Sequence, residues 1–410
     1  MDQHKLYRTI KSLGEAKFRT SEEMLGHILQ TIIQDEVFPI RGGRIWKFEN
    51  ASGSYRLVSQ FGEMDQIQKN FRIRVADYPL FTHLHRKGTI VTTETNKYLR
   101  QKGIRHYSAT GVGEKIQWKN HTLYQYVIAI NADFLKQDLL YALNIIGTAV
   151  TSALQNRRIE SKAKHLERDL DQAREIQKSI LPEHELRFHH FDLYGVSLPD
   201  RVVGGDFFDY LQATDDKDRL GVVIGDAASK GLSAAAQALY VSGALRMGVE
   251  FQMKLSTLIA RINQLVNKTF TAEHFISMFF AELTSADNGL VFYVNAGHSN
   301  PILLHASTDI AEPLRATGQL IGPFPNERYR AEYALMLKGD ILLLYTDGIV
   351  EAMNDQRQMY GEARLGSQLR EHRSRSPREI CQLILEDVQI HSKLQEYSDD
   401  KTIVVIKRSR

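Results

Sequence analysis

The chain has 410 residues, more than a single hydrophobic core usually serves, so two domains and a connecting segment are expected. The net charge of +3 is small, and Lys and Arg are interspersed with acids, which argues against nucleic acid as the main partner. The single cysteine, Cys381, excludes an internal disulfide, a thiolate metal cluster and a CxxC redox pair. Because there is no apolar leader and no run of about 18 apolar residues, we expect a cytoplasmic protein without a membrane segment.

The first part of the chain alternates helical and strand-like patterns. Thr20 to Glu23 can form a capping box, and the apolar spacing from Met24 to Ile33 is typical of an amphipathic helix. Three later stretches are rich in β-formers: Arg44 to Phe48, Tyr55 to Phe61 and Leu123 to Ile130. We therefore predict a small α/β domain over residues 1–135.

A long helical pattern follows, from Leu139 to Leu181, and Pro182 ends it. Its apolar residues step by four and three in two blocks separated by a phase slip near Leu154 to Arg158. The blocks are Leu139, Leu143, Ile146, Val150 and Ala153, and then Ile159, Ala163, Leu166, Leu170 and Ala173. This spacing predicts a coiled-coil linker over 136–182 that joins two chains in a homodimer; the alternative is a single helix lying on its own domain.

Residues 183–410 are strand-rich and interrupted by helices. Apolar runs predict strands at Gly221 to Ala227, Ile276 to Leu283, Leu290 to Asn295, Pro301 to His305, Ile341 to Tyr345 and Thr402 to Ile406. Helices are predicted at Ser233 to Val249, Leu255 to Phe270 and Pro377 to Gln389, the last capped by Ser376. Strands on both sides of consecutive helices indicate an α+β domain with two sheets covered by helices.

Four short stretches place an Asp beside β-formers, where a strand end or tight turn can direct an oxygen ligand inward. They are Val203-Gly204-Gly205-Asp206, Ile224-Gly225-Asp226, Tyr345-Thr346-Asp347-Gly348 and Ser398-Asp399-Asp400-Lys401-Thr402. Each alone is more typical of a turn than of a ligand. The series of four indicates a site for Mg²⁺ or Mn²⁺, since these hard cations prefer oxygen ligands.

With these motifs the chain resembles the metal-dependent serine/threonine phosphatases of the PPM (type 2C-like) family, in the RsbU/SpoIIE branch. The resemblance extends from Ala173 to the C-terminus. The matching stretches, in family order, are Ala173 to Pro182, Val203 to Asp209, Gly225-Asp226 with Lys230-Gly231, Asn295 to His298 with Pro301, Tyr345 to Ala352 with Asn354, and Asp399 to Thr402. It implies a C-terminal αββα sandwich and a hydrolase that dephosphorylates a phosphoprotein.

The resemblance also implies roles for individual residues. Asp226 would bridge two Mn²⁺ or Mg²⁺ ions, Asp206 would serve one ion, and Asp347 and Asp399 the other. The Ala227 carbonyl would be a further ligand and Asp400 a supporting residue. Lys230 and Gly231 would begin a helix whose position depends on the regulatory state. Two such ions can lower the pKa of a bridging water, so that hydroxide attacks phosphorus without a covalent phosphoenzyme.

Three residues carry open alternatives. Ser229 stands where the family has a glycine, and it would be strained if that position needs a positive φ. His298 is either a general acid or, as is commoner for a His in a Gly-rich turn, a structural hydrogen-bonding residue. Arg201 could bind a substrate phosphate, or it is an ordinary solvated arginine.

The order of elements in the N-terminal domain resembles a GAF domain, a module that binds a small molecule or a partner protein. No motif of that family can be mapped residue by residue, so the ligand stays open. A sensor joined to an enzyme by a helical dimer can shift the enzyme between inactive and active forms. The phosphatase resemblance further implies that the substrate is a phosphorylated anti-sigma-factor antagonist of the STAS type, in a partner-switching pathway.

Two other functions are compatible with parts of the sequence. A phosphatase-like adaptor would bind a partner without turnover, and Ser229 is the departure that suggests it. The intact acids Asp206, Asp226, Asp347 and Asp399 argue against that adaptor. A nucleotide cyclase or phosphodiesterase also uses paired acids, but Asn295 to His298 and Tyr345 to Glu351 do not suit it.

Overall fold

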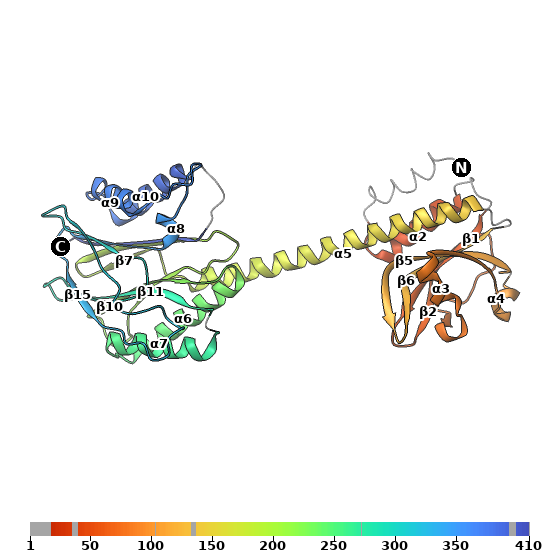
Figure 1. The fold of residues 1–410 in the computed structure, drawn as a ribbon, viewed down its shortest axis with the longest axis horizontal. Coiled ribbons are helices and arrows are strands. Elements are labelled where there is room, and N and C mark those ends of the chain that lie inside the picture. Colours follow the sequence, from red (N-terminus) through yellow and green to blue (C-terminus); the bar gives the residue numbers. More distant parts are fainter. Residues whose placement is uncertain are drawn as a thin grey trace. The chain divides into compact units, whose positions relative to one another are not determined.

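The computed structural model describes residues 18–34, 40–102, 104–132, 137–271, 273–392 and 399–409. Two compact units, Met1–His165 and Leu166–Arg410, are considered separately below (Figure 1). Their boundary falls inside the long helix α5 (Gln137–Ile180), so the predicted limits of the linker at 136 and 182 stay predictions. The start of the chain, where no leader was expected, lies outside the described residues. Ser398, the first residue of the fourth Asp motif, also lies outside them.

The N-terminal unit contains one six-stranded antiparallel sheet, in the order β3-β2-β1-β6-β5-β4. Its elements before α5 are α2 (Ser21–Gln34), β1 (Ile40–Glu49), β2 (Ser54–Gly62), β3 (Arg72–Arg74), η1 (Val75–Asp77), α3 (Leu80–Lys87), β4 (Thr89–Thr93), α4 (Lys97–Gln101), β5 (His106–Trp118) and β6 (His121–Ala132). The predicted first helix and three strands are confirmed. The longest strand of this unit, β5, was missed because Gly111 and Gly113 in its middle interrupt the pattern of β-formers.

Successive side chains along each strand point to opposite faces of this sheet, and apolar residues are buried on both faces. One face packs on α2 and on the first part of α5, and includes Ile45 and Ile128. The opposite face includes Trp46 and Val127 and packs on α3 and α4 through Phe81, Leu84 and Leu99. Two separate apolar layers therefore hold this unit together.

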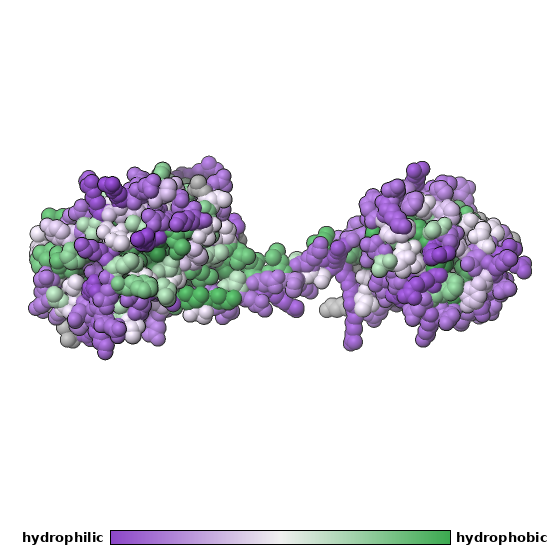
Figure 2. All heavy atoms as spheres, turned by 90° about the horizontal axis from the view of Figure 1, so that it is seen from below, coloured by the Kyte–Doolittle hydropathy of each residue, from purple (hydrophilic) through white to green (hydrophobic). Residues whose placement is uncertain are grey.

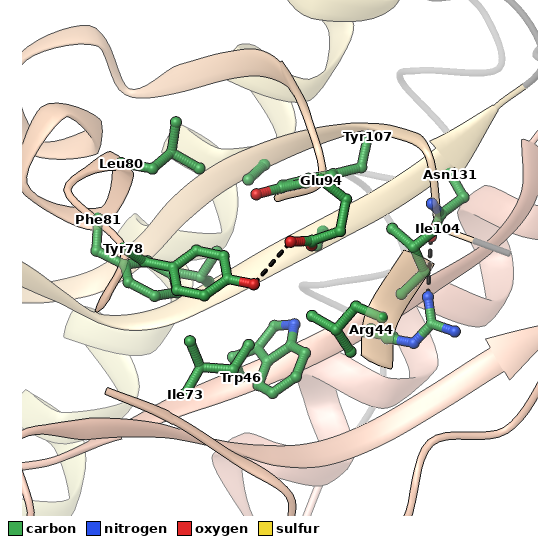
Figure 3. A pocket seen from close by; sticks show the side chains of 14 residues that line it. Arg44, Trp46, Ile73, Tyr78, Leu80, Phe81, Glu94, Ile104, Tyr107 and Asn131 are labelled. Atoms are coloured by element: carbon green, nitrogen blue, oxygen red, sulfur yellow. Dashed lines mark hydrogen bonds between the residues drawn. The ribbon is translucent and has the colours of Figure 1, made fainter. Parts of the chain in front are cut away.

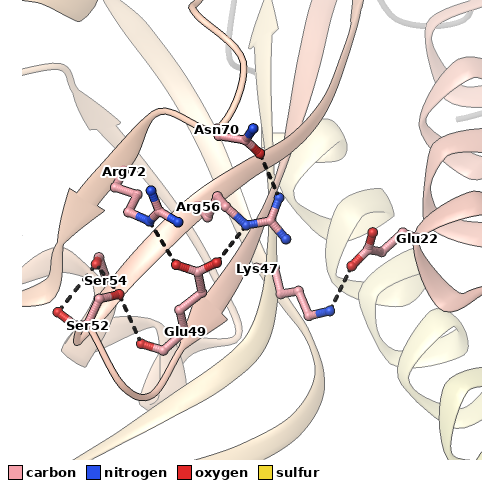
Figure 4. A network of polar contacts seen from close by, with 8 residues as sticks. All are labelled: Glu22, Lys47, Glu49, Ser52, Ser54, Arg56, Asn70 and Arg72. Carbon is pink, nitrogen blue, oxygen red and sulfur yellow. Dashed lines mark hydrogen bonds and ion pairs between the residues drawn. The ribbon is translucent and has the colours of Figure 1, made fainter.

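Ion pairs join neighbouring elements at the rim of the same sheet (Figure 4). Arg56 and Arg72 donate to the Glu49 carboxylate at 2.6 Å and 2.8 Å, and Lys47 donates to Glu22 of α2 at 2.7 Å. Such partly exposed pairs contribute little free energy, so they mainly favour the observed register of β1, β2 and β3.

The two apolar blocks of α5 differ in their surroundings. Leu139, Leu143, Ile146 and Val150 are buried against the N-terminal unit's own sheet, so the first block is not a seam between chains and the own-domain alternative holds for it. In the second block Ile159 and Leu166 are 65% and 60% exposed. Figure 2 shows hydrophobic atoms among the hydrophilic ones along the helix. The prediction of a coiled coil therefore now rests on the second block alone.

The C-terminal unit has two antiparallel sheets, in the orders β15-β12-β11-β10-β9 and β14-β13-β16-β17-β8-β7. Its strands are β7 (Glu185–Phe188), β8 (Phe191–Leu198), β9 (Phe207–Leu211), β10 (Arg219–Ala227), β11 (Ile276–Thr284), β12 (Leu290–Ala296), β13 (Ile302–Leu304), β14 (Ala311–Pro313), β15 (Glu332–Leu335), β16 (Ile341–Tyr345) and β17 (Lys401–Arg408). Its helices after α5 are α6 (Leu232–Glu250), α7 (Leu255–Thr269), α8 (Asp347–Val350), α9 (Glu362–Glu371) and α10 (Pro377–His391).

Three apolar layers hold these elements together: one between the two sheets and one on the outer face of each sheet. The sheets pack on each other through residues such as Phe279 and Val404. Helices α6 and α7 cover the outer face of the first sheet, and α9 and α10 cover that of the second. The predicted α+β arrangement of two helix-covered sheets is thus confirmed, as is Ser376 as the cap of α10, where Glu379 completes a capping box that was not predicted. Among the described residues, no helix combines the length and apolar character needed to cross a membrane.

Candidate active site

Strands of both sheets bring the four motifs to one end of the sandwich. Asp226 lies at the end of β10, opposite Ser277 of β11. Asp206 directly precedes β9, the other neighbour of β10. Asp347 begins α8 immediately after β16, and Asp399 lies just before β17, which pairs with β16. The expected strand-end positions are confirmed, except that Asp347 begins a short helix rather than a turn.

These ends enclose a cavity of about 320 Å³. Predicted site residues that line it are Asp226, Ala227, Asp347, Asp399, Asp400, Lys230, Gly231 and Arg201. Asp206 is not among the lining residues; it is 4% exposed, and its Oδ2 accepts a 2.7 Å hydrogen bond from the Thr346 hydroxyl. The structure therefore brings three of the four proposed ligand carboxylates to the cavity surface and leaves the fourth buried.

The acids raise one another's pKa. Burial, followed by the charges of Asp347, Asp399 and Asp400, raises the pKa of Asp226 to about 7. Burial and the Asp226 charge raise the pKa of Asp206, and burial with the nearby Glu351 and Asp399 charges raises that of Asp347. Lys230 Nζ lies 3.4 Å from Asp399 Oδ2. Negative charge is thus concentrated here, and a bound cation would relieve the repulsion.

The donor set has the chemistry that Mg²⁺ and Mn²⁺ prefer, because every candidate ligand is an oxygen. Among the described residues, however, no group of three or more His, Cys, Asp or Glu side chains is already arranged to hold a metal ion. The carboxylates share a cavity without forming a closed ligand shell. The residues fit a divalent metal in charge and donor type, and their side chains would have to reorient around it.

Asp400 holds the loop that carries Asp206. Its Oδ1 accepts from the Asp200 backbone N–H at 2.7 Å, and its Oδ2 accepts from those of Gly205 at 2.6 Å and Asp206 at 3.3 Å. Hydrogen bonds from backbone N–H groups thereby engage both carboxylate oxygens. This contact agrees with the predicted supporting role.

Two glycines allow the close approach that this arrangement needs. A Cβ on Gly204 would lie 2.7 Å from Asp400 Oδ2, and one on Gly348 would lie 1.9 Å from the Asp400 carbonyl oxygen. A side chain at Gly348 would require a backbone shift, and one at Gly204 would displace the Asp400 carboxylate. The glycines beside Asp206 and Asp347 therefore serve the packing of the site.

The loop after Asp226 corrects one expectation. Ser229 does not have a positive φ, so the strain considered for a residue in place of the family glycine is absent. Its hydroxyl instead accepts a 2.7 Å hydrogen bond from Gln237 Nε2 of α6. Gly231, with φ of 68°, supplies the left-handed conformation that leads into α6.

His298 and Arg201 have different surroundings. His298 is 5% exposed and does not line the cavity; its Nδ1 is 2.8 Å from Ser277 Oγ, and burial lowers its pKa to about 4. These contacts favour the structural alternative for His298. Arg201 lies at the cavity with a largely exposed side chain, 3.9 Å from Asp200, where it can reach a bound anion.

No role was predicted for two groups that attach the end of α5 to this site. The Gln177 carboxamide donates to the Gly204 carbonyl at 2.7 Å and accepts from its N–H at 3.2 Å. Arg246 of α6 donates to Asp209 at 2.7 Å and to the Ile180 carbonyl at 2.6 Å. Gln177 and Asp209 belong to quoted motif stretches, but spacing alone could not show their partners.

Comparison with known proteins gives a consistent result for this unit. Residues 216–409 match the family model described as Stage II sporulation protein E (SpoIIE). Protein IcfG of Synechocystis sp. is 27% identical over 302 residues, which cover 67% of this chain and 46% of that protein, so the chain spans about half of its length. Phosphoserine phosphatase RsbU of Bacillus subtilis is 23% identical over 283 residues, covering 67% of this chain and 81% of that protein.

A solved structure has the same fold. The SiaA-PP2C domain of Pseudomonas aeruginosa superposes with a TM-score of 0.53 and 20% identity, covering 60% of this chain and 98% of that domain. This likeness establishes that the C-terminal unit has a PP2C-like fold.

Proposed function

The C-terminal domain belongs to the SpoIIE family of PPM-type serine/threonine phosphatases, and on this premise we propose that the chain is a metal-dependent phosphoserine/phosphothreonine protein phosphatase. The observation that carries the proposal is the convergence of Asp226, Asp347 and Asp399 on one cavity from separate parts of the sequence. Burial and neighbouring acids raise the pKa values of Asp226 and Asp347, as expected for an acidic cluster that a divalent cation would stabilise.

In this proposal Asp206, Asp226, Asp347, Asp399 and the Ala227 carbonyl hold two Mn²⁺ or Mg²⁺ ions. When bound, such ions provide an acidic water and neutralise charge on the phosphoryl oxygens. Asp400 orients the Asp206 loop through its backbone hydrogen bonds. Lys230 and Arg201, at the cavity surface, attract and orient the substrate phosphate.

We also propose that the N-terminal unit is a GAF-like sensor that controls the phosphatase. The contacts of Gln177 with Gly204 support this idea, because they tie the end of α5 to the loop of a proposed metal ligand. The exposed apolar residues Ile159 and Leu166 suit a homodimeric coiled coil in which α5 changes register. A phosphorylated STAS-type anti-sigma antagonist is the proposed substrate, in keeping with the SpoIIE-family phosphatase domain.

One observation favours a second candidate, a phosphatase-like adaptor with weak or no turnover. The described residues contain no ready-made cluster of metal ligands. Such a protein would bind its partner through the same face without releasing phosphate.

Hydrolysis of para-nitrophenyl phosphate separates the two candidates. We expect turnover with Mn²⁺ that chelator abolishes, and loss of that turnover in Asp226→Asn and in Asp347→Asn. Arg378→Gln, on the exposed surface of α10, is the control and should keep wild-type turnover. Failure of the wild-type protein to turn over substrate with either metal would favour the adaptor.

A further inference from the structure

Gln237, on the second turn of α6, is a polar side chain with no exposed surface. Its Nε2 donates to the Ser229 hydroxyl at 2.7 Å and to the Ser233 carbonyl at 3.3 Å, and its Oε1 has no hydrogen-bond partner among the described residues. A buried amide oxygen without a partner costs free energy that an apolar side chain of the same size would not. What the glutamine adds at this position is its donor group.

Another buried polar atom without a partner among the described residues is Arg44 Nε, in the N-terminal unit. Figure 3 shows the Arg44 guanidinium directed to Asn131 beside a small cavity. The space in that cavity is about 30 Å³, which suits a water molecule rather than a larger ligand. Gln237 differs because its partner, Ser229, lines the candidate active-site cavity of about 320 Å³.

The orientation of the Gln237 carboxamide sets the direction of its hydrogen bond with Ser229. The Ser233 carbonyl can only accept, so the NH₂ group of Gln237 faces it, and the same group donates to Ser229. The Ser229 hydroxyl is therefore the acceptor in this bond. A hydroxyl has one proton to donate, and Gln237 does not use it, so this proton can serve an acceptor in the cavity that Ser229 lines.

Backbone hydrogen bonds hold the loop that carries Ser229. The Ser229 N–H donates to the Ala227 carbonyl at 2.6 Å, and the Ala228 N–H donates to the Phe275 carbonyl at 2.9 Å. Ser229 does not have a positive φ, so alanine or threonine fits the same backbone. A substitution at this position consequently changes the hydroxyl and leaves the path of the chain.

We propose that Ser229 donates its hydroxyl proton to the phosphoryl group of the substrate, and that Gln237 is a positioning residue that holds the hydroxyl in this direction. The inference rests on the proposed function, because it places a phosphoryl group in the active-site cavity. Phosphoryl oxygens carry negative charge, so a hydrogen bond to them is of the stronger, charge-assisted kind. Ser229 thus adds a neutral donor to the charged Arg201 and Lys230, which line the same cavity.

Binding of inorganic phosphate to the full-length protein, in the presence of Mg²⁺, tests the hydroxyl. In calorimetric titrations we expect Ser229→Ala to bind phosphate about tenfold more weakly than wild type, because one charge-assisted hydrogen bond is lost. Ser229→Thr keeps a hydroxyl and should bind within about threefold of wild type. Ser307→Ala, on the exposed turn between β13 and β14, is the matched control and should bind normally. The kcat/KM for para-nitrophenyl phosphate should follow the same order.

A double-mutant cycle separates positioning by Gln237 from a purely structural role. Gln237→Met is similar in size but lacks the donor, and it should weaken phosphate binding by about threefold or more. Added to Ser229→Ala it should cause no further loss, because Gln237 acts through the hydroxyl. Titration with Mg²⁺ should give wild-type metal binding in each variant.

The inference is overturned if Ser229→Ala binds phosphate as wild type does, or if it loses metal binding. It is also overturned if Gln237→Met weakens phosphate binding equally with and without the Ser229 hydroxyl. Absence of phosphate binding by the wild-type protein would instead count against the proposed function and this inference together.

Discussion

The side chain of Gln177 and the backbone of Gly204 form a reciprocal pair of hydrogen bonds, at 2.7 Å and 3.2 Å. Gly204 and the next residue, Gly205, lead directly to Asp206, and Asp400 holds the same loop from its other side. The last turn of α5 is therefore part of the support of the proposed metal site. Movement of this helix along or around its axis would be transmitted to Asp206.

We expect Gln177→Ala to lower Mn²⁺-dependent turnover by about tenfold or more, because the loss of two hydrogen bonds frees the Asp206 loop. Gln172→Ala, at an exposed position of the same helix, is the matched control. Initial rates on para-nitrophenyl phosphate measure both variants. Equal rates for the two would show that α5 does not orient this loop.

Gly348→Ala should destabilise the C-terminal domain by about 3 kcal/mol, since the new methyl group would meet the Asp400 carbonyl at 1.9 Å. Gly243→Ala is the control in another helix, where a Cβ meets nothing within 4 Å, and it should be neutral or stabilising by about 0.5–1 kcal/mol. Chemical denaturation measures both changes. Similar stability of the two variants would contradict the packing described for Gly348.

Stability of the metal-free protein should fall as the pH rises. Asp226 has a folded-state pKa of about 7, above its ordinary value of 3.8. Its stabilising contribution is therefore present below the unfolded-state pKa and is lost as the pH rises through about 7, and Asp206 and Asp347 act in the same direction. We expect a lower Tm in chelator at about pH 8 than at about pH 5, with a smaller difference in Asp226→Asn. A Tm that rises over this range equally in both proteins would refute the assignment.

The double variant Leu166→Asp plus Leu170→Asp should disrupt the proposed seam of α5. Leu166 is 60% exposed in a single chain, so the change has little effect on the folding of either unit. We expect dimers to become monomers in sedimentation analysis, and activation to change while Mn²⁺ binding is kept. Leu143→Asp, which alters the buried first block, should instead destabilise the N-terminal unit. An unchanged oligomeric state and unchanged regulation in the double variant would show that α5 does not form a coiled coil between two chains.

Sequence patterns predicted the structure correctly where interactions between residues close in the sequence determine it. The strand before Asp347 and the Ser376 cap of α10 were predicted from neighbouring residues alone, and both are confirmed. The four Asp motifs could be recognised because acids beside glycines at strand ends recur in a fixed order. The resemblance that they carry agrees with the SpoIIE match.

Other features depend on tertiary contacts that no local pattern contains. The first block of α5 has the spacing of a coiled coil, yet it packs on its own sheet, because the same spacing suits any apolar partner. The hydrogen bond between Ser229 and Gln237, eight positions further along the chain on α6, could not be read from the loop sequence. The buried position of Asp206 likewise appears only when distant strands come together, as does the buried Arg44 Nε, which has no hydrogen-bond partner among the described residues.

Calorimetric titration of the chelator-treated protein with Mn²⁺ tests the central claim most directly. The account predicts saturable binding of two ions per chain in the wild-type protein, and loss of this binding in Asp226→Asn, with Arg378→Gln unchanged. Absence of saturable binding to the wild-type protein, or equal binding by Asp226→Asn, would contradict the claim that these carboxylates hold the metals of a phosphatase.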